Sequence, residues 1–318
     1  MCLRRALSAL CLTLGVLTSA FAQNYPLRPV RLITGDAGGT ADITSRMIAR
    51  GLAGYLGQQV IVDNRAGGGG AIAAQMVTKA PPDGYTLVLY SSALWIGPLL
   101  EDMPWDPVKD FAPVILVASA PTVLVVHPSV PVKSVRELIA LAKARPGALN
   151  YASGGLGGAP HLAGELFKAK AGVNFVRVTY KGSGSAVADL LSGYVQLTFG
   201  SAASVAHYVK SQRVKALAVT SAQPSALTPD LPTIAASGVP GYVAVGYYPM
   251  FVAAGTPVNL INRLNQETLR VINMPEMKQQ FLAAGVEPVG GTPGELASVL
   301  ASEIAMWGKL FSDAGIRK

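Results

Sequence analysis

Cysteine is almost absent from this 318-residue chain, because both of its cysteines, Cys2 and Cys11, lie within the first 22 residues. That segment has the features of a secretory signal peptide: two arginines, a 12-residue apolar run at positions 6–17 and a small-x-small cleavage site that ends at Ala22. The apolar run is shorter than the roughly 20 residues of a membrane-spanning helix. We therefore expect an exported chain that begins at Gln23 and has no disulfide, thiolate nucleophile or cysteine metal ligand.

Groups suited to catalysis are also few. The three histidines, His127, His161 and His207, have no metal-binding partner at an HExxH-like spacing. The chain has neither the G-x-S-x-G motif of α/β hydrolases nor the GK[ST] motif of a P-loop, and residues 68–73 fit a dinucleotide fingerprint only loosely. His161 lies near an expected helix start, where a hydrogen bond to the backbone is the ordinary interpretation. The sequence predicts no catalytic residue, no metal and no cofactor.

Charge and aromatic content are low as well, at 14% and 7% of the residues. Removal of Arg4 and Arg5 with the signal peptide, which contains no acid, lowers the formal net charge from +8 to +6. A basic surface can steer anionic solutes, although plain solvation of the surface explains it equally well. The basic residues are scattered and have no interleaved aromatics, so no nucleic-acid partner is predicted.

Short β-rich segments alternate with glycine-rich turns and helices along the whole chain. The alternation predicts an α/β fold, and the length of the mature chain suits two lobes, each a mostly parallel sheet flanked by helices. In the first part, strands at 30–34, 60–64 and 86–92 are expected, with a helix at about 40–55, a second helix through Met76 and a loop containing Trp95. Residues 111–128 read as a strand pair, and 241–257 as a long strand that returns to the first lobe.

Helix starts are marked in two places by capping-box spacing, at Ser134 with Glu137 and at Thr292 with Glu295. The last helix carries an apolar stripe that is predicted to face the core rather than a ligand. Its members are Leu296, Leu300, Ile304, Trp307 and Phe311.

Five turns rich in glycine, serine and threonine follow the expected strands. Small residues let backbone N–H and hydroxyl donors approach a ligand closely, and a helix N-terminus carries a partial positive charge. Glycine turns are also ordinary strand-to-helix connections, but their recurrence in both halves of the chain favours binding of an anion. Four or five such donors, at about 1.5–3 kcal/mol each, account for micromolar affinity, about 8 kcal/mol. The turns lie at 38–42, 91–92, 153–158, 181–185 and 201–204.

Ten segments, in order, resemble the Bug-type solute-binding proteins of tripartite tricarboxylate transport systems, and together they run from Tyr25 almost to the last residue. Any one segment is weak evidence, whereas ten in the family's order are specific. They are YPLRPVRLI at 25–33, AGGTAD at 37–42 followed by Arg46, LGQQVIVDNRAGGGG at 56–70, PDGYTL at 82–87, DPVKDFAPV at 106–114, HLAGELFK at 161–168, YKG at 180–182, ALAVTS at 216–221, AGTP at 254–257 and AGI at 314–316.

The resemblance implies a periplasmic, monomeric protein with the two-lobed periplasmic-binding-protein fold, type II-like, that is not an enzyme. Such a protein closes on a small carboxylate by hinge motion and delivers it to a membrane permease. Lobe 1 is expected to hold residues 23–122 and 247–318, and lobe 2 residues 123–246, with hinges at 118–122 and 245–249. The expected ligand-binding residues are Asp36, Gly38, Gly39, Thr40, Asp42, Ser91, Ser92, Ser153, Gly154, Gly157, Gly158, Lys181, Gly182, Ser183, Ser201 and Tyr247.

The chain departs from the family pattern at several of these places. Thr34 and Gly35 stand where the family usually has Pro-Phe, with Asp36 beside them; Gly158 stands where Ser or Thr is common, Gly200 where Asp is common, and Tyr247 where Trp is common. The expected solute is a small carboxylate: a dicarboxylate, an amino acid or an aromatic acid. An acid near the anion site suggests that the ligand differs from a plain dicarboxylate and carries a cationic or donor group that faces Asp36, as in an amino acid or a pyridine carboxylate. The alternative is that Asp36 points to solvent.

Two other functions fit the same cleft. A closed, ligand-bound protein could dock on a receptor kinase as a sensor instead of on a permease. An exported enzyme is the third reading, and it would need a cluster of acid, base and nucleophile that the sequence does not display.

Overall fold

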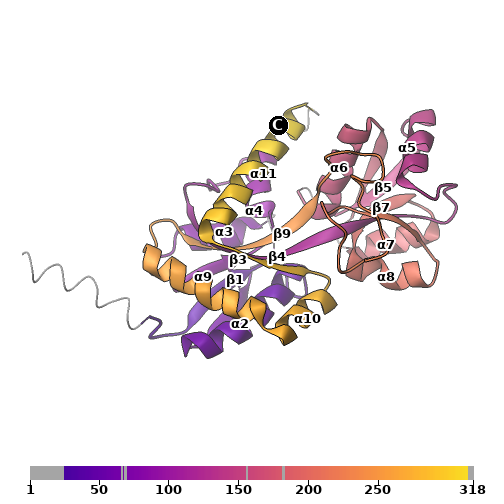
Figure 1. Ribbon diagram of the computed structural model, residues 1–318. Helices are drawn as coiled ribbons and strands as arrows, with labels where there is room; N and C mark the ends of the chain where they lie inside the picture. The colour runs from indigo at the N-terminus through magenta and orange to yellow at the C-terminus, as the bar shows by residue number, and fades with distance from the viewer. Residues whose placement is uncertain (1–24, 66, 68–69, 155–156, 181–182, 314–318) are drawn as a thin grey trace, which may run out of the picture.

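The computed structural model describes residues 25–65, 67, 70–154, 157–180 and 183–313, so the expected signal peptide lies outside the described residues. Strands and helices alternate and confirm the expected α/β class (Figure 1). In chain order the elements are β1 (Val30–Thr34), α2 (Thr40–Leu56), β2 (Val60–Asn64), α3 (Ala71–Thr78), β3 (Thr86–Leu89), α4 (Ala93–Leu100), β4 (Phe111–Val126), α5 (Val135–Ala144), β5 (Leu149–Ser153), α6 (Ala159–Ala171), β6 (Phe175–Thr179), α7 (Ser183–Ser192), β7 (Leu197–Ser201), α8 (Ala202–Lys210), β8 (Lys215–Val219), β9 (Val245–Ala253), α9 (Val258–Asn273), α10 (Pro275–Ala283), β10 (Glu287–Gly290) and α11 (Pro293–Asp313).

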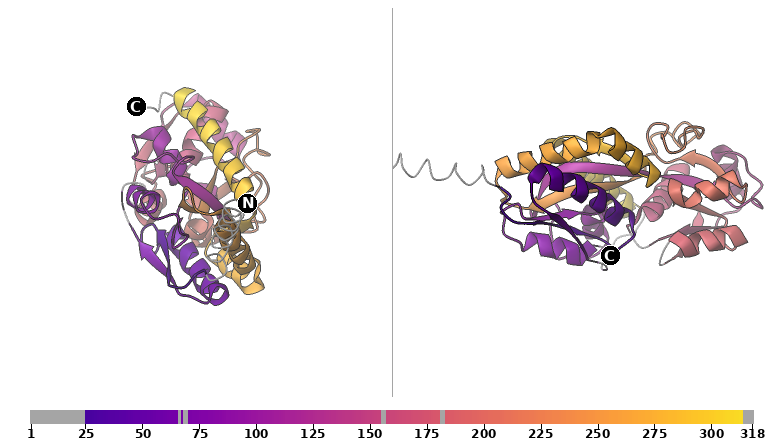
Figure 2. Two further views of the ribbon diagram at one scale, coloured as in Figure 1. Left: turned by 90° about the vertical axis from the view of Figure 1, so that its left-hand side faces the viewer. Right: turned by 90° about the horizontal axis from the view of Figure 1, so that it is seen from below.

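The strands of the described residues follow one path, β2-β1-β3-β9-β4-β7-β5-β6, with β10 and β8 also paired to β4. The path bends into two lobes that lie side by side, and the molecule is longest along β4 and β9 (Figure 2). We use lobe 1 for the part built on β1–β3, β9, β10 and the first part of β4, and lobe 2 for the part built on β5–β8 and the end of β4.

In lobe 1, β1, β2 and β3 are parallel, as expected, and β9 and β10 add antiparallel pairs. Successive side chains of a strand point to opposite faces of the sheet, so β1 contributes to the cores on both faces. Val30 and Leu32 pack with α2, α9 and α10, whereas Ile33 packs with α3, α4 and α11. The apolar stripe of α11 faces this second core, as its spacing predicts.

Lobe 2 repeats the arrangement with β5, β6 and β7 parallel and with β4 and β8 antiparallel to each other. Leu124 and Val126 of β4 pack with α5 and α6, while Val123 and Val125 pack with α7 and α8. Each sheet therefore has helices on both faces, and its strand ends and turns remain at the edge facing the other lobe.

Strand β4 belongs to both lobes. It pairs with β9 up to Pro121 and with β7 from Thr122 onward, so the change of partner falls between these two residues. At the change, the N–H of Thr122 donates to the buried hydroxyl of Thr220 at 2.8 Å, and that hydroxyl donates to the Thr122 carbonyl at 3.0 Å. The side chain of Thr220 thus satisfies a backbone group where the ladder with β9 ends.

Three local expectations differ from the structure. Residues 111–126 form one strand rather than a pair. Its pairing with β9 shifts register beside Pro113, which lacks an N–H, and again between Leu116 and Ala118. Trp95 lies in helix α4, not in a loop, and Pro98 is inside that helix. The returning strand begins at Val245, later than expected.

The expected capping box at Thr292 is complete, whereas at Ser134 only the N-cap half is present, because the Glu137 carboxylate accepts from the N–H of Lys133 at 2.7 Å. The N–H of Glu137 donates to the Ser134 hydroxyl at 3.2 Å, and Thr292 and Glu295 satisfy each other's backbone N–H groups at 3.2 and 2.6 Å. No helix among the described residues has the length and apolar character that crossing a membrane requires.

Candidate ligand-binding site

A cleft of about 600 Å³ lies between the two lobes and is lined by both. Its walls come from the turns after β1, β3, β5 and β7, where the sheet edges of the two lobes face each other. Nine residues expected from the sequence line it: Gly38, Thr40, Ser91, Ser92, Ser153, Gly154, Gly157, Gly158 and Ser201.

Two helices direct uncapped N-termini at the cleft, one from each lobe. Helix α2 begins after Gly39 and α6 begins after Gly158, and neither N-cap residue offers a side chain to the first-turn N–H groups. Helix α8 differs, because the Ser201 hydroxyl already accepts from the N–H of Ser204 at 3.3 Å. The first turns of α2 and α6 therefore keep donors and partial positive charge for an anion.

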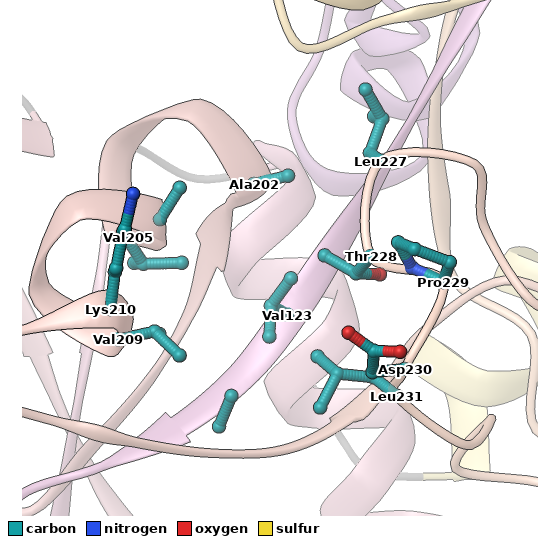
Figure 3. Close-up of a pocket in the computed structure, with 12 residues that line it drawn as sticks. Val123, Ala202, Val205, Val209, Lys210, Leu227, Thr228, Pro229, Asp230 and Leu231 are labelled. Atoms are coloured by element: carbon teal, nitrogen blue, oxygen red, sulfur yellow. The ribbon is translucent and has the colours of Figure 1, made fainter. Parts of the chain in front are cut away.

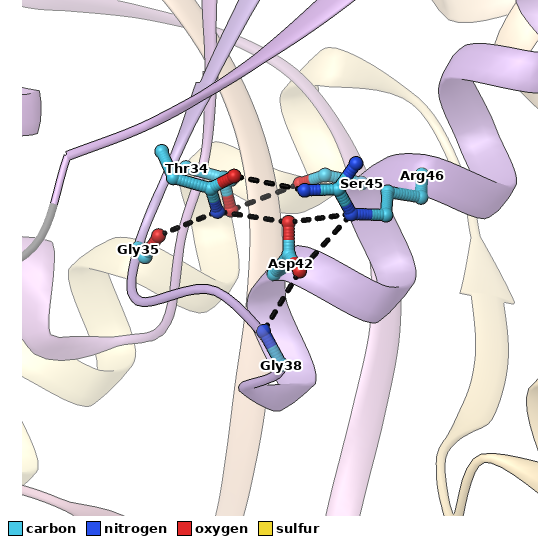
Figure 4. A network of polar contacts seen from close by, with 7 residues as sticks. Thr34, Gly35, Gly38, Asp42, Ser45 and Arg46 are labelled. Carbon is cyan, nitrogen blue, oxygen red and sulfur yellow. Dashed lines mark hydrogen bonds and ion pairs between the residues drawn. The ribbon is translucent and has the colours of Figure 1, made fainter.

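Asp42 lies outside the cleft lining and organises the turn before α2 (Figure 4). Its carboxylate accepts from the N–H of Gly38 at 2.9 Å, from the Asn64 amide at 2.8 Å and from the Arg46 guanidinium at 3.1 Å. Burial alone raises the pKa of Asp42, but these hydrogen bonds outweigh burial and hold the pKa below its ordinary value. Asp42 is thus a positioning residue, and the Gly38 N–H is committed to it rather than to a ligand.

Asp36 and Gly39 are also outside the lining. The N–H of Gly39 donates to the Asp36 carbonyl at 3.1 Å, and Asp36 itself is exposed. The ring of Tyr90 fills the space beside Gly35, where an added Cβ would lie 2.9 Å from it, and both burial and the Asp36 carboxylate raise the pKa of Tyr90. Asp36 is therefore near Tyr90 but exposed and outside the lining, as in the alternative that Asp36 points to solvent.

Tyr248, not Tyr247, lines the cleft. Neighbouring residues of β9 point to opposite faces, so only one of the two can reach it. The Tyr248 hydroxyl is hydrogen-bonded to Thr40. Tyr247 instead packs against the core of α3, α4 and α11, and burial, together with the nearby Glu303 carboxyl, raises its pKa to about 12. The lining residue is thus one position further along the strand than the expected Tyr247.

Several lining residues were not expected from the sequence. Thr122 and Gly246 lie on the strands that cross between the lobes, and Ala284 and Gly285 on the turn before β10, none of which has a motif of its own. Ala203 and Ser204 belong to the turn at 201–204 that the sequence indicates, although neither is named there as a ligand-binding residue. The remaining ones give no signal because they are small or apolar: Ile43, Ala120, Ala159, Pro160, Ala186, Val187, Thr198 and Gly200.

His161 is a structural acceptor, as the sequence suggested. It is 2% exposed, and its Nδ1 accepts from the N–H of Gly157 at 3.1 Å. Burial, assisted by the charge of Arg177, lowers its pKa to about 4, so the ring is neutral at ordinary pH. This bond holds the turn that leads into α6.

Three expected residues cannot be placed in the site. Lys181 and Gly182 lie outside the described residues, and Ser183 is known only as the first residue of α7. The described chain has no cluster of histidine, cysteine, aspartate and glutamate that could hold a metal ion.

A second pocket, of about 270 Å³, lies on the other side of α8 (Figure 3). Val205 and Val209 of α8 and Leu231 of the loop at 227–231 line it, with Val123 of β4. Ser201, Ala203 and Ser204 line the cleft instead, so α8 separates the two hollows.

The comparisons with known proteins fit this geometry. The family described as "Tripartite tricarboxylate transporter family receptor" matches residues 44–316. The chain belongs to this family. Protein BugT of Bordetella pertussis, strain Tohama I, is 36% identical over 309 residues, which cover 96% of this chain and 95% of BugT.

Solved structures agree. Rpa4515 of R. palustris, solved with adipate, is 37% identical and has a TM-score of 0.80, with 92% of this chain and 98% of that chain covered. MatC from Rhodopseudomonas palustris, solved with bound malate, is 26% identical with a TM-score of 0.77, covering 90% and 99% of the two chains. The fold is thus shared with proteins whose structures were solved with adipate or malate.

Proposed function

We propose that this protein captures a small carboxylate in the cleft between its lobes and passes it to the membrane permease of a tripartite tricarboxylate transport system. The observation that carries the proposal is the pair of uncapped helix N-termini, of α2 and α6, which meet at one cleft from opposite lobes. An anion held between them bonds to both lobes at once, and it therefore favours the closed arrangement.

Family membership supports this assignment, and so do the adipate and malate in two related structures. The lining supplies mostly neutral donors, namely backbone N–H groups and the hydroxyls of residues such as Ser91, Ser92 and Ser201, and these donors suit a carboxylate oxygen. The proposed ligand classes are dicarboxylates, amino acids and aromatic acids.

The moving units in this proposal are residues 23–122 with 247–318, and residues 123–246. The hinge is placed where β4 changes partner, between Pro121 and Thr122, and at the start of β9. Closure about two strands suits a site whose walls come from both sides.

A thermal-shift screen of residues 23–318 against malate, adipate, amino acids and aromatic acids tests the function. A ligand at 100 times its Kd adds about 2.7 kcal/mol of stability, which is a readily measured shift. We expect at least one acid to stabilise the protein and to be recovered unchanged by mass spectrometry. No shift with any acid, or consumption of the ligand, contradicts the proposal.

A further inference from the structure

Arg177 lies directly behind the wall of the cleft in lobe 2. It is half-buried on β6, the outer strand, and pairs in register with Tyr151 of β5. Its Nε donates to the Ser153 hydroxyl at 2.7 Å, and its Nη2 donates to the Gly154 carbonyl at 3.1 Å. Both of these partners line the cleft, although Arg177 itself does not.

The guanidinium has no counter-ion among the described residues. No carboxylate of the described chain lies within ion-pair distance of Arg177, whereas Arg31, Arg46 and Arg65 each have one. Glu165, on the adjacent helix α6, is committed to Lys168 at 2.8 Å and to the Tyr151 hydroxyl at 2.5 Å. A half-buried positive charge beside a cleft that faces it with neutral groups attracts an anion there.

The hydrogen bonds of Arg177 also fix the polarity of Ser153. A guanidinium only donates, so the Ser153 oxygen must accept from it and keeps its own proton to donate. Ser153 is 1% exposed, and its hydroxyl lies 3.2 Å from the Gly154 carbonyl, which already accepts from Arg177. Reorienting this proton toward a ligand oxygen leaves the Gly154 carbonyl with a partner.

We infer that Arg177 is a positioning residue that supplies the lobe 2 wall with positive charge and makes Ser153 a hydrogen-bond donor toward a ligand carboxylate. The inference rests on the proposed function, which it deepens: the lobe 2 end of the site selects an ionised carboxylate over a neutral amide of the same shape. Arg177 acts through Ser153 and Gly154 and does not touch the ligand.

The first test needs no ligand, because the neighbouring His161 reports the same charge. Groups that act on His161 are Arg177, Glu165 and Lys168, and its pKa is about 4 in the wild-type protein. NMR titration of His161 in residues 23–318 is compared among wild type, Arg177→Gln, Arg177→Lys and Arg145→Gln, the last removing an exposed arginine of the same lobe. Arg177→Gln is expected to raise the His161 pKa, while Arg177→Lys and Arg145→Gln leave it close to wild type.

The second test uses adipate and its monoamide as probes, with Kd measured by calorimetry. Because the charge is lost, Arg177→Gln is expected to bind adipate about tenfold more weakly than wild type does. Binding of the monoamide is expected to weaken less, so the preference for the dianion falls. Arg177→Lys is expected to keep most of the wild-type preference. Equal weakening of both probes, or an unchanged His161 pKa, overturns the inference. If wild type does not bind adipate, the choice of ligand in the proposed function fails, and the His161 titration still tests whether the charge of Arg177 acts at the lobe 2 wall.

Discussion

At the scale of single residues, Asp42 determines which backbone N–H groups remain available to a ligand. Because its carboxylate takes up the Gly38 N–H, the donors left at this end are those of the first turn of α2. Arg46 and Asn64 hold the carboxylate in place, so the turn is fixed by residues that do not line the cleft.

Asp42→Asn is expected to destabilise the protein by about 2–3 kcal/mol, because an amide cannot accept from all three donors and leaves buried groups unpaired. Ligand affinity falls as well, since the turn before α2 loosens. Urea unfolding and calorimetry measure the two effects. Asp83→Asn, which removes an exposed ion pair with Arg28, is the control, and equal losses in the two variants contradict this role.

His161 predicts a dependence of stability on pH. The folded state keeps the ring neutral down to about pH 4, whereas the ring in an unfolded chain takes up a proton near pH 6.5. The unfolded state therefore binds more protons between these values, and the free energy of unfolding falls as the pH is lowered from about 6.5 to about 4, by about 3 kcal/mol.

The control is His161→Gln, because a glutamine oxygen can accept from the Gly157 N–H and does not titrate. Urea unfolding at half-unit pH steps from 4 to 7 should show a smaller slope for this variant than for wild type. Parallel curves would assign the slope to other groups.

The sequence predicted the site at the level of turns but not at the level of atoms. Glycine and serine after a strand indicate the right segments, which is why nine expected residues line the cleft. Local sequence does not show which N–H groups are already hydrogen-bonded, because the groups that hold the acceptor can lie far along the chain, as Asn64 holds Asp42. It also does not show which of two neighbours, such as Tyr247 and Tyr248, points toward the cleft, because that depends on how the strand is oriented.

At the scale of elements, β4 is the feature that local sequence describes least well. Pro113 and Pro121 argue against one continuous strand. The structure keeps one by shifting its register against β9 beside Pro113, and just after Pro121 the strand changes its partner from β9 to β7. Trp95 is similar, since Gly97 and Pro98 argue against a helix, but packing of Trp95 on Phe251 favours one. In both cases contacts with distant segments outweigh local preference.

Thr220→Val is expected to cost about 1–3 kcal/mol, because it leaves the buried N–H of Thr122 without an acceptor where β4 changes partner. Thr268→Val is the matched control: it removes an equally buried hydroxyl, but one whose partner, the Leu264 carbonyl, lies within helix α9. Thermal unfolding should rank Thr220→Val clearly below Thr268→Val, and the reverse order would reject this account of the hinge.

At the scale of the whole molecule, the lobes touch on both sides of the cleft. A Cβ on Gly157 of lobe 2 would lie 3.6 Å from Ile96 of lobe 1, and one on Gly285 of lobe 1 would lie 2.8 Å from Ala203 of lobe 2. The second contact leaves no room for a side chain at Gly285. Gly285 thus permits the close approach of the two lobes at that side of the cleft.

A polar contact joins the lobes outside the cleft. Glu287 of β10 accepts from the Ser225 hydroxyl at 2.6 Å and from the N–H of Ala226 at 3.1 Å, both in the loop after β8. Glu287→Ala is expected to favour opening, which enlarges the radius of gyration of the ligand-free protein in X-ray scattering and weakens ligand binding a few-fold. Glu101→Ala, an exposed change in lobe 1, serves as the control, and identical scattering and affinity for the two variants would exclude a role of Glu287 in closure.

The order of the strands also sets an order of assembly. Leu87 of β3 pairs with Val252 of β9, 165 positions later, and β9 is what links β3 to β4 in the described sheet. Strands β4 to β8 are close in sequence and can pair as soon as residue 219 is available. Because distant pairings form slowly, lobe 2 is expected to complete its sheet first. Lobe 1 contains the first strands of the sheet, but its sheet is completed only after β9, near the end of the chain, has paired with β3.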